Sequence, residues 1–163
     1  MKALCTLHIY LLTHSRELER PTNTGVLVKQ VLGQQCTVLE WQRKLPNPDL
    51  LLHIQHKAIA LLYPHSTSHE LQKQSKHFDS FILLDATWQE AQKMYNHSPY
   101  LHDLPKFSLK LDAPSIYTLR RNQKETGLCT AECAIELLKL HQQTKQADMI
   151  HNHLRSLIQQ NLH

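Results

Sequence analysis

Short apolar runs alternate with longer amphipathic segments along this chain of 163 residues. Four of the runs have the length of single β-strands. Those at 58–64 and 81–87 are almost continuously apolar, which is typical of parallel strands covered on both faces. We therefore predict an α/β fold with a mostly parallel sheet flanked by helices, with strands over 4–12, 36–41, 58–64 and 81–87.

The segments between these runs have the apolar or mixed spacing of helices. Each has a Ser, Thr, Asn or Asp near its start, where such residues commonly cap a helix. We expect crossover helices over 23–34, 48–56 and 66–78.

Beyond residue 87 the predicted elements are more varied. A helix over 88–95 precedes a connector marked by Pro99 and Pro105, and two short extended pieces follow at 107–111 and 116–120. Prolines at such a position indicate that regular structure is interrupted.

The last part of the chain is predicted to be helical. A helix over 130–144 is followed by a helical segment over 148–160, which we interpret as a tail over about 147–163 with a solvated polar face. Its apolar stripe consists of Met149, Ile150, Leu154, Leu157 and Ile158. No interdomain linker or internal repeat is visible, so residues 1–163 are expected to form one domain.

Composition narrows the class of protein. With 41% hydrophobic and 20% charged residues, the chain has ordinary globular usage and is large enough to bury a core without disulfides. Its four cysteines are therefore expected to be reduced thiols. The formal net charge of +4 favours a polyanionic partner only weakly, because such a balance is common in globular proteins.

Neither a membrane span nor a signal peptide is expected. No apolar run approaches the ~20 residues needed to cross a bilayer. The opening segment, 1–17, has an apolar core broken by His8 and contains no small-residue cleavage site. We interpret it as a first strand in a cytoplasmic protein.

An acid and an indole stand where the run at 81–87 meets the helix that follows. Thr87 and Glu90 have the spacing of a capping box, so Thr87 is expected to begin that helix. Asp85 then lies at the carboxyl end of a parallel strand, where open α/β sheets bind their ligands. In the alternative, Asp85 only satisfies helix-start amides and Trp88 only packs on the sheet.

Two further clusters carry charge near a helix start. Arg16 and Arg20 precede the sequence NTG at 23–25, and backbone amides at such a helix start bind anions. Arg120 and Arg121 are adjacent on an extended segment, so they point to opposite faces and one of them is able to contact a phosphate or carboxylate. The alternatives are an ordinary capped helix after a polar loop and a solvated surface.

A metal site is not expected. Cys129 and Cys133 are one helical turn apart, a spacing that could supply two metal ligands, but both are interpreted as buried small residues. The glycine motifs of P-loops, dinucleotide-binding folds and α/β-hydrolases are also missing from the sequence.

Four motifs, taken in order, resemble the DTW-domain family: ELERPTNTG, LLYP, LLDATWQEAQKM and YTLRRNQKETGLCTAECAIELL. The resemblance covers roughly residues 9–140. It implies an α/β fold related to SPOUT-type transferases, with a knotted carboxyl-terminal half that binds S-adenosylmethionine. Knots are rare in proteins, so this feature follows from the resemblance alone.

Bacterial members of this family are tRNA-uridine aminocarboxypropyltransferases. They move the 3-amino-3-carboxypropyl group of S-adenosylmethionine to N3 of a tRNA uridine and release methylthioadenosine. Because the leaving sulfur already carries positive charge, the resemblance implies a transfer without a metal that needs an aligned nucleophile and a base. The expected partners are therefore tRNA and S-adenosylmethionine.

The resemblance also implies roles for individual residues. Asp85 matches the motif acid and is the candidate base for the N3 proton, or the group that orients the uracil. Thr87 would cap its helix, and Trp88 would pack against the cofactor pocket or stack on a flipped base. Arg120 or Arg121 would hold the donor carboxylate or an RNA phosphate.

The resemblance places the donor against backbone of the LLYP motif and of the loop 127–132. This pocket would be formed by Leu62, Tyr63, Pro64, Gly127, Leu128, Cys129, Thr130 and Glu132. The substrate-binding part of the same cleft would be lined by Arg16, Arg20, Thr24 and Gly25.

Two other functions fit the same residues. One is an S-adenosylmethionine-dependent RNA methyltransferase of the same broad fold, which would release S-adenosylhomocysteine. The other is a non-catalytic RNA-binding module, which the basic balance supports. Longer family members also carry an amino-terminal cysteine cluster that these residues lack, and this chain has Cys129 where many members have a serine.

Overall fold

The computed structural model describes residues 6–56, 58–64, 69–70, 77–109 and 129–160. Within these residues a single sheet has six strands, all parallel, in the order β2-β1-β5-β3-β6-β4. The strands are β1 (His8–Thr13), β2 (Cys36–Glu40), β3 (Ile59–Leu62), β4 (His69–Glu70), β5 (Ser80–Asp85) and β6 (Lys106–Ser108). The predicted α/β class with a mostly parallel sheet is confirmed.

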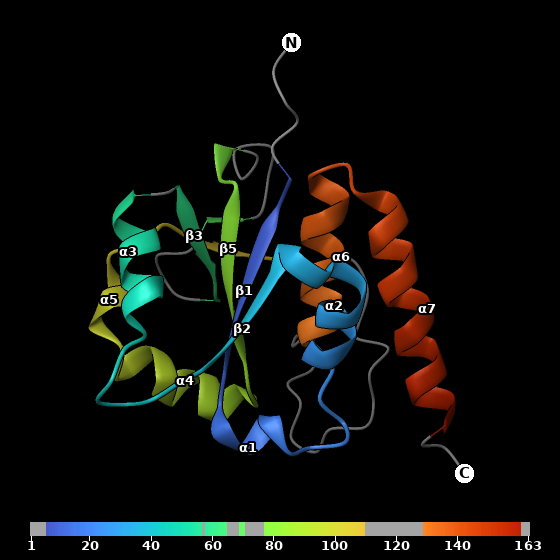
Figure 1. The fold of residues 1–163 in the computed structure, drawn as a ribbon, viewed down its shortest axis with the longest axis horizontal. Coiled ribbons are helices and arrows are strands. Elements are labelled where there is room, and N and C mark those ends of the chain that lie inside the picture. Colours follow the sequence, from blue (N-terminus) through green and yellow to red (C-terminus); the bar gives the residue numbers. More distant parts are fainter. Residues whose placement is uncertain (1–5, 57, 65–68, 71–76, 110–128, 161–163) are drawn as a thin grey trace.

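Helices cover both faces of this sheet, as Figure 1 shows. One layer consists of α2 (Gly25–Leu32), α6 (Thr130–Leu140) and α7 (Thr144–Gln160). The other layer consists of α3 (Pro48–His56), α4 (Trp88–Asn96) and α5 (Pro99–His102). A short helix, α1 (Ser15–Leu18), follows β1, and the 3-10 helix η1 (Gly33–Gln35) leads into β2.

Successive residues of the central strands face opposite layers and supply two separate cores. On β1, Ile9 and Leu11 pack toward α2, α6 and α7, whereas Tyr10 and Leu12 pack toward α3 and α4. β5 behaves in the same way and is buried along nearly its whole length. A strand covered on both faces needs apolar residues at every position, which explains why these runs are continuous in the sequence.

Most predicted helices form close to their expected bounds. α3 occupies the predicted residues, and α4 extends the predicted helix by one residue to Asn96. α6 ends at Leu140, four residues before the predicted end at residue 144. The proline-marked connector is partly helical, because Pro99 takes the first position of α5, where its missing N–H costs nothing.

The helix predicted over 66–78 is wrong at residues 69–70. These two residues form β4, which pairs in parallel with β6 at the edge of the sheet. The partner strand lies more than 30 residues later in the chain, so local spacing does not reveal the pairing. Residues 65–68 and 71–76 lie outside the described residues.

The helical segment predicted over 148–160 lies within the longer helix α7. α7 packs against α6 and α2, and Ala147, Ile150 and Leu154 are completely buried. Leu157 and Ile158 are partly buried against the same core, but Met149 is 44% exposed and does not belong to the stripe. Met149 precedes the buried Ile150 by one residue, so its side chain points away from α2 and α6. Contact with these two helices, and not hydrophobicity alone, decides which residues of α7 are buried.

The carboxyl ends of β1 and β5 meet where the strand order reverses. From β1 the chain proceeds to β2 on one side and then crosses to β3, beyond β5. Open α/β sheets bind ligands at such a reversal. Thr13 and Asp85, the last residues of the two strands, are direct neighbours there. The knotted path expected from the resemblance depends on residues 110–128, which lie outside the described residues.

Candidate functional site

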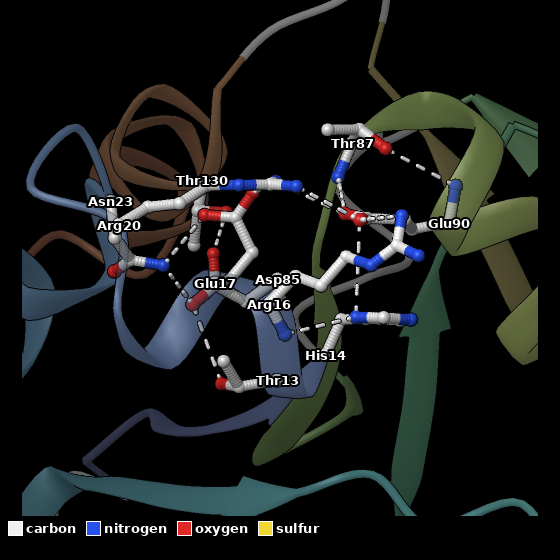
Figure 2. Close-up of polar contacts among 10 residues, drawn as sticks. All are labelled: Thr13, His14, Arg16, Glu17, Arg20, Asn23, Asp85, Thr87, Glu90 and Thr130. Atoms are coloured by element: carbon white, nitrogen blue, oxygen red, sulfur yellow. Dashed lines mark hydrogen bonds and ion pairs between the residues drawn. The ribbon is translucent and has the colours of Figure 1, made fainter.

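Asp85 lies at the centre of a polar cluster at the carboxyl edge of the sheet, drawn in Figure 2. Asp85 is only 2% exposed. Thr130 Oγ1 donates to Oδ1 at 2.8 Å, while Asn23 Nδ2 and Thr13 Oγ1 donate to Oδ2 at 2.9 and 3.3 Å. The carboxylate therefore joins the end of β1, the turn before α2 and the first residue of α6.

The helix that follows Asp85 is capped by Thr87, as predicted. Glu90 N donates to Thr87 Oγ1 at 3.2 Å, and Thr87 N donates to Glu90 Oε1 at 3.0 Å. This is the reciprocal capping box expected from the sequence. Since Thr87 caps α4, the described side-chain contacts of Asp85 serve other elements, and the alternative that limits Asp85 to the start of α4 does not account for them.

The start of α2 fits closely against the Asp85 carboxylate. A Cβ atom added at Gly25 would lie 2.5 Å from Asp85 Oδ2, so only glycine permits this approach. Thr24 is fully buried, and its Oγ1 accepts a hydrogen bond from Ala131 N at 3.1 Å. The NTG sequence thus positions α6 next to Asp85, and Thr24 itself does not line an open cleft.

Arg20, predicted to bind substrate, is paired within the protein. Its guanidinium donates to Glu17 Oε1 and forms two hydrogen bonds to Glu90, of 3.2 Å to Oε1 and 3.0 Å to Oε2. Asn23 Nδ2 donates to Glu17 Oε2 at 3.0 Å as well as to Asp85. The three buried carboxylates are therefore linked by one guanidinium and one amide.

This pairing shifts the pKa values of both partners. The hydrogen bond to Glu90 raises the pKa of Arg20 most strongly, although partial burial opposes it. Burial alone would raise the pKa of Glu90, but hydrogen bonds from Arg20 and Thr87 outweigh it and hold the pKa below its ordinary value. Both groups thus remain charged and fixed at neutral pH.

Arg16 is the cation of this cluster that faces solvent. Its side chain is 74% exposed, and Nη1 lies 4.0 Å from Glu90 Oε2. His14, immediately after β1, accepts a hydrogen bond from Arg16 N on Nδ1 at 3.1 Å. The His14 ring stacks on Trp41 with centroids 6.0 Å apart and planes at 23°. Arg16 therefore keeps the role of a candidate contact to an anionic substrate.

Trp88 lies beside Tyr63, at the ends of β5 and β3. Their rings are stacked with centroids 6.0 Å apart and planes at 17°. Tyr63 also stacks on Tyr95 at 4.6 Å, and burial raises the pKa of the Tyr63 hydroxyl. Leu62 is buried in the core on the opposite face of the sheet, and Pro64 is exposed. Tyr63 of the LLYP motif and Trp88 of the D-x-T-W motif, both of which the resemblance associates with the donor pocket, are thus in contact.

The amino terminus of α6 completes the described part of the site. Cys129 is buried directly before the helix, and its N–H donates to Glu132 Oε1 at 3.1 Å. Burial raises the pKa of the Cys129 thiol well above its usual range, so it is a neutral group here. The remaining predicted residues, Arg120, Arg121, Gly127 and Leu128, lie outside the described residues.

Several residues of the cluster were not selected from the sequence. Asn23, Glu17 and Glu90 carry its internal hydrogen bonds, and His14 and Trp41 flank it. Asn23 belongs to the NTG sequence and Glu17 to the ELER motif, so the motifs contained a signal for both. The contact between His14 and Trp41 joins residues 27 positions apart and leaves no sign in the sequence.

The described residues contain neither a metal-binding cluster nor a helix able to span a membrane. No group of three or more His, Cys, Asp or Glu side chains among them has a geometry that would hold a metal ion. Among the same residues, no helix has both the length and the apolar character needed to cross a membrane.

Comparison with known proteins adds independent information. The family model described as "DTW domain" matches residues 1–162. The chain is 29% identical over 136 residues to the tRNA-uridine aminocarboxypropyltransferase 2 of Drosophila melanogaster. The aligned residues are 80% of this chain and 54% of that protein. Proteins of the same name from Mus musculus and Macaca fascicularis are 28% and 22% identical, each over 82% of this chain and 47% of their own length.

The chain spans about half the length of these curated relatives. No solved structure matches it.

Proposed function

The chain belongs to the DTW domain family, and on that premise we propose that it is a tRNA-uridine aminocarboxypropyltransferase. It would move the 3-amino-3-carboxypropyl group of S-adenosylmethionine to N3 of a tRNA uridine. The observation that carries this proposal is that three separate motifs meet at one carboxylate. Asp85 of the D-x-T-W motif accepts hydrogen bonds from Asn23 of the NTG sequence and from Thr130, the threonine of the T-x-E motif.

The reaction requires that an amide nitrogen be made nucleophilic. N3 of the uracil gives its proton to a base, and its lone pair forms a bond to the terminal carbon of the aminocarboxypropyl group. The bond between that carbon and sulfur breaks, and its electron pair stays on sulfur, so that neutral methylthioadenosine leaves. No metal is needed, because the positive charge on sulfur already makes it a good leaving group.

The described residues fit an S-adenosylmethionine donor. Trp88, which stacks on the buried Tyr63, is only partly buried and offers aromatic surface after the end of β5, suited to a planar base or an apolar chain. The amino terminus of α6, at Thr130, places the positive end of the helix dipole at this edge of the sheet, where it would attract the donor carboxylate. The donor supplies the transferable carbon and the cationic sulfur, and the protein supplies binding and alignment.

We assign Asp85 the role of a positioning residue. Its described contacts hold β1, the NTG turn and α6 in place, and a substrate that used it as a base would have to displace one of those donors. The role of base for the N3 proton remains the alternative for this carboxylate. In both roles the ionised carboxylate is required, so Asp85→Asn is expected to lose transfer.

Other parts of the sequence-based expectation also remain proposals. The relation to SPOUT-type folds and the knotted carboxyl-terminal half would place Arg120, Arg121, Gly127 and Leu128 near the donor. Arg120 or Arg121 would hold the donor carboxylate or an RNA phosphate, as the family resemblance implies. Cytoplasmic location stays a prediction from the sequence.

The identity of the released nucleoside tests the proposal. Purified protein is incubated with unmodified tRNA transcripts and S-adenosylmethionine, and the nucleosides are separated by chromatography. Methylthioadenosine is expected. S-Adenosylhomocysteine would instead identify a methyltransferase, and calorimetry that detects RNA binding without donor binding would favour a non-catalytic RNA-binding module.

A further inference from the structure

His14 occupies a fixed position directly beside the Asp85 cluster. It follows Thr13, the last residue of β1, and its backbone N–H donates to Asp85 O at 3.1 Å. Its side chain also caps α1, because Nδ1 accepts the hydrogen bond from Arg16 N. The imidazole is therefore held at the carboxyl edge of the sheet by both its backbone and its ring.

The hydrogen bond from Arg16 N determines which tautomer His14 adopts. A ring nitrogen that accepts a hydrogen bond carries no proton, so in the neutral ring the proton is on Nε2. The nearest carboxylate oxygen, Glu90 Oε2, lies 3.9 Å from Nδ1, which is too long for a hydrogen bond. Nε2–H is thus the donor that this imidazole presents.

The direction of this donor is also fixed. Trp41 stacks on the ring, and the indole N–H of Trp41 donates to Ser98 Oγ at 2.8 Å, which holds the indole in turn. Figure 2 shows that the Nε2 end of the ring points away from the carboxylates of the cluster. The side chain is 17% exposed. In the described part of the chain, no hydrogen-bond acceptor meets Nε2.

We propose that the Nε2–H of His14 donates a hydrogen bond to a carbonyl oxygen of the target uracil. This inference rests on the proposed function and names a residue that recognises the substrate base. Uracil carries carbonyl groups on both sides of N3, and loss of the N3 proton spreads negative charge onto their oxygens. A fixed donor at one of these oxygens stabilises the charge that develops during the transfer.

A contact to O4 also selects against cytosine, because cytosine has an amino group at position 4 and shares only O2 with uracil. The exocyclic amino group of cytosine is a donor, and a donor that faces Nε2–H leaves both groups unsatisfied. A binding site that is built to hydrogen-bond one polar group strongly rejects analogues that lack that group. Arg16 lies two residues after His14, in α1, and its exposed guanidinium is placed to meet a phosphate of the same RNA.

Two substitutions at position 14 separate this role from the capping of α1. His14→Asn places a carbonyl oxygen near the position of Nδ1, so it keeps the cap for Arg16 N but removes the donor at Nε2. His14→Gln places an amide N–H near the position of Nε2, so it keeps the donor but loses the cap. The two variants are measured with unmodified tRNA transcripts and S-adenosylmethionine, alongside the unmutated protein.

The proposal predicts opposite orders for stability and activity. His14→Asn is expected to unfold at the higher temperature of the two, yet to lower kcat by roughly 10²- to 10³-fold with a smaller change in KM for tRNA. His14→Gln is expected to unfold at the lower temperature and yet to keep kcat within about tenfold of the unmutated protein. Donor affinity, measured by calorimetry, is expected to be the same for all three proteins.

The outcomes distinguish this inference from the proposed function. Wild-type kcat in His14→Asn, or no advantage of His14→Gln over His14→Asn, would overturn the role of Nε2–H while the transferase assignment stands. Failure of the unmutated protein to modify uridine would overturn both.

Discussion

The hydroxyl of Thr130 donates to the Asp85 carboxylate at 2.8 Å, although the two residues are 45 positions apart in the chain. Asp85 ends the central strand β5, and Thr130 is the first residue of α6. Two sequence motifs that look independent are therefore one structural unit. The expected donor pocket and the acid at the end of β5 are joined by this hydrogen bond, so a change in either residue affects both.

Asp85→Asn tests this shared role. The amide would place an N–H₂ group against Thr130 Oγ1 or against Asn23 Nδ2, both of which donate to the carboxylate. We expect the free energy of unfolding to fall by about 1–3 kcal/mol, because a buried donor loses its acceptor. Urea unfolding measures this change, and a variant as stable as the unmutated protein would show that these hydrogen bonds do not hold the site together.

Gly25→Ala tests the close approach of α2 to the same carboxylate. Its Cβ would lie 2.5 Å from Asp85 Oδ2 and 3.0 Å from Asp85 Cγ, so either the helix or the acid must move. We expect a loss of about 1–3 kcal/mol in the free energy of unfolding, together with reduced transfer.

Val26→Ala is the matched control for that experiment, because Val26 is the next residue of α2 and is exposed. Its stability is expected to stay within about 0.5 kcal/mol of the unmutated protein. Equal effects of the two substitutions would indicate that helix propensity, rather than contact with Asp85, controls this position.

The ion pair of Arg20 with Glu90 predicts how stability depends on pH. Because the folded-state pKa of Glu90 lies below its ordinary value of 4.5, its ionised form stabilises the fold at any pH above that value. This contribution is lost as pH falls through the lower, folded-state pKa. Glu90→Gln removes the charge, so the variant is expected to be less stable than the unmutated protein at pH 7.

Urea unfolding at a series of pH values measures that difference directly. The gap between Glu90→Gln and the unmutated protein is expected to narrow below about pH 4.5, where the carboxylate begins to take up a proton. A gap that stays constant, or widens in acid, would contradict the assignment of this ion pair.

Arg16→Ala is expected to weaken tRNA binding without destabilising the protein. The side chain is 74% exposed and its nearest carboxylate oxygen is 4.0 Å away, so little folding energy depends on it. Loss of one phosphate contact lowers affinity and reduces the slope of log affinity against log salt by about one unit.

Arg155→Ala, on the exposed side of α7, removes the same charge far along the chain from the cluster. Binding curves at several salt concentrations compare the two variants. An unchanged salt slope in Arg16→Ala, or the same change in Arg155→Ala, would mean that the carboxyl edge of the sheet is not the RNA-binding face.

Local sequence patterns predicted the fold well where the pattern is set by neighbouring residues. β5 and α3 were located because burial on two faces or on one stripe imposes a period on the sequence. β4 was missed because it exists through pairing with β6. The apolar stripe of α7 was predicted, but its packing on α2 and α6 was not. Periodicity does not contain these tertiary contacts.

The same reasoning explains what was found in the site. Asp85 and Thr130 were selected as members of motifs, and they are in contact. Arg20 was expected to face substrate, but Glu17 and Glu90 approach it from two elements, and sequence spacing does not reveal that. His14 was not selected, since its importance depends on a tautomer fixed by a neighbouring amide and on the ring of Trp41.

Mass spectrometry of both products in one reaction tests the central claim most directly. Unmodified tRNA transcripts are incubated with the protein and S-adenosylmethionine, then digested to nucleosides. The account predicts a uridine that carries a 3-amino-3-carboxypropyl group, with one methylthioadenosine released for each modified uridine and neither product formed by Asp85→Asn. Uridine without this group, or a methylated nucleoside together with S-adenosylhomocysteine, would contradict it.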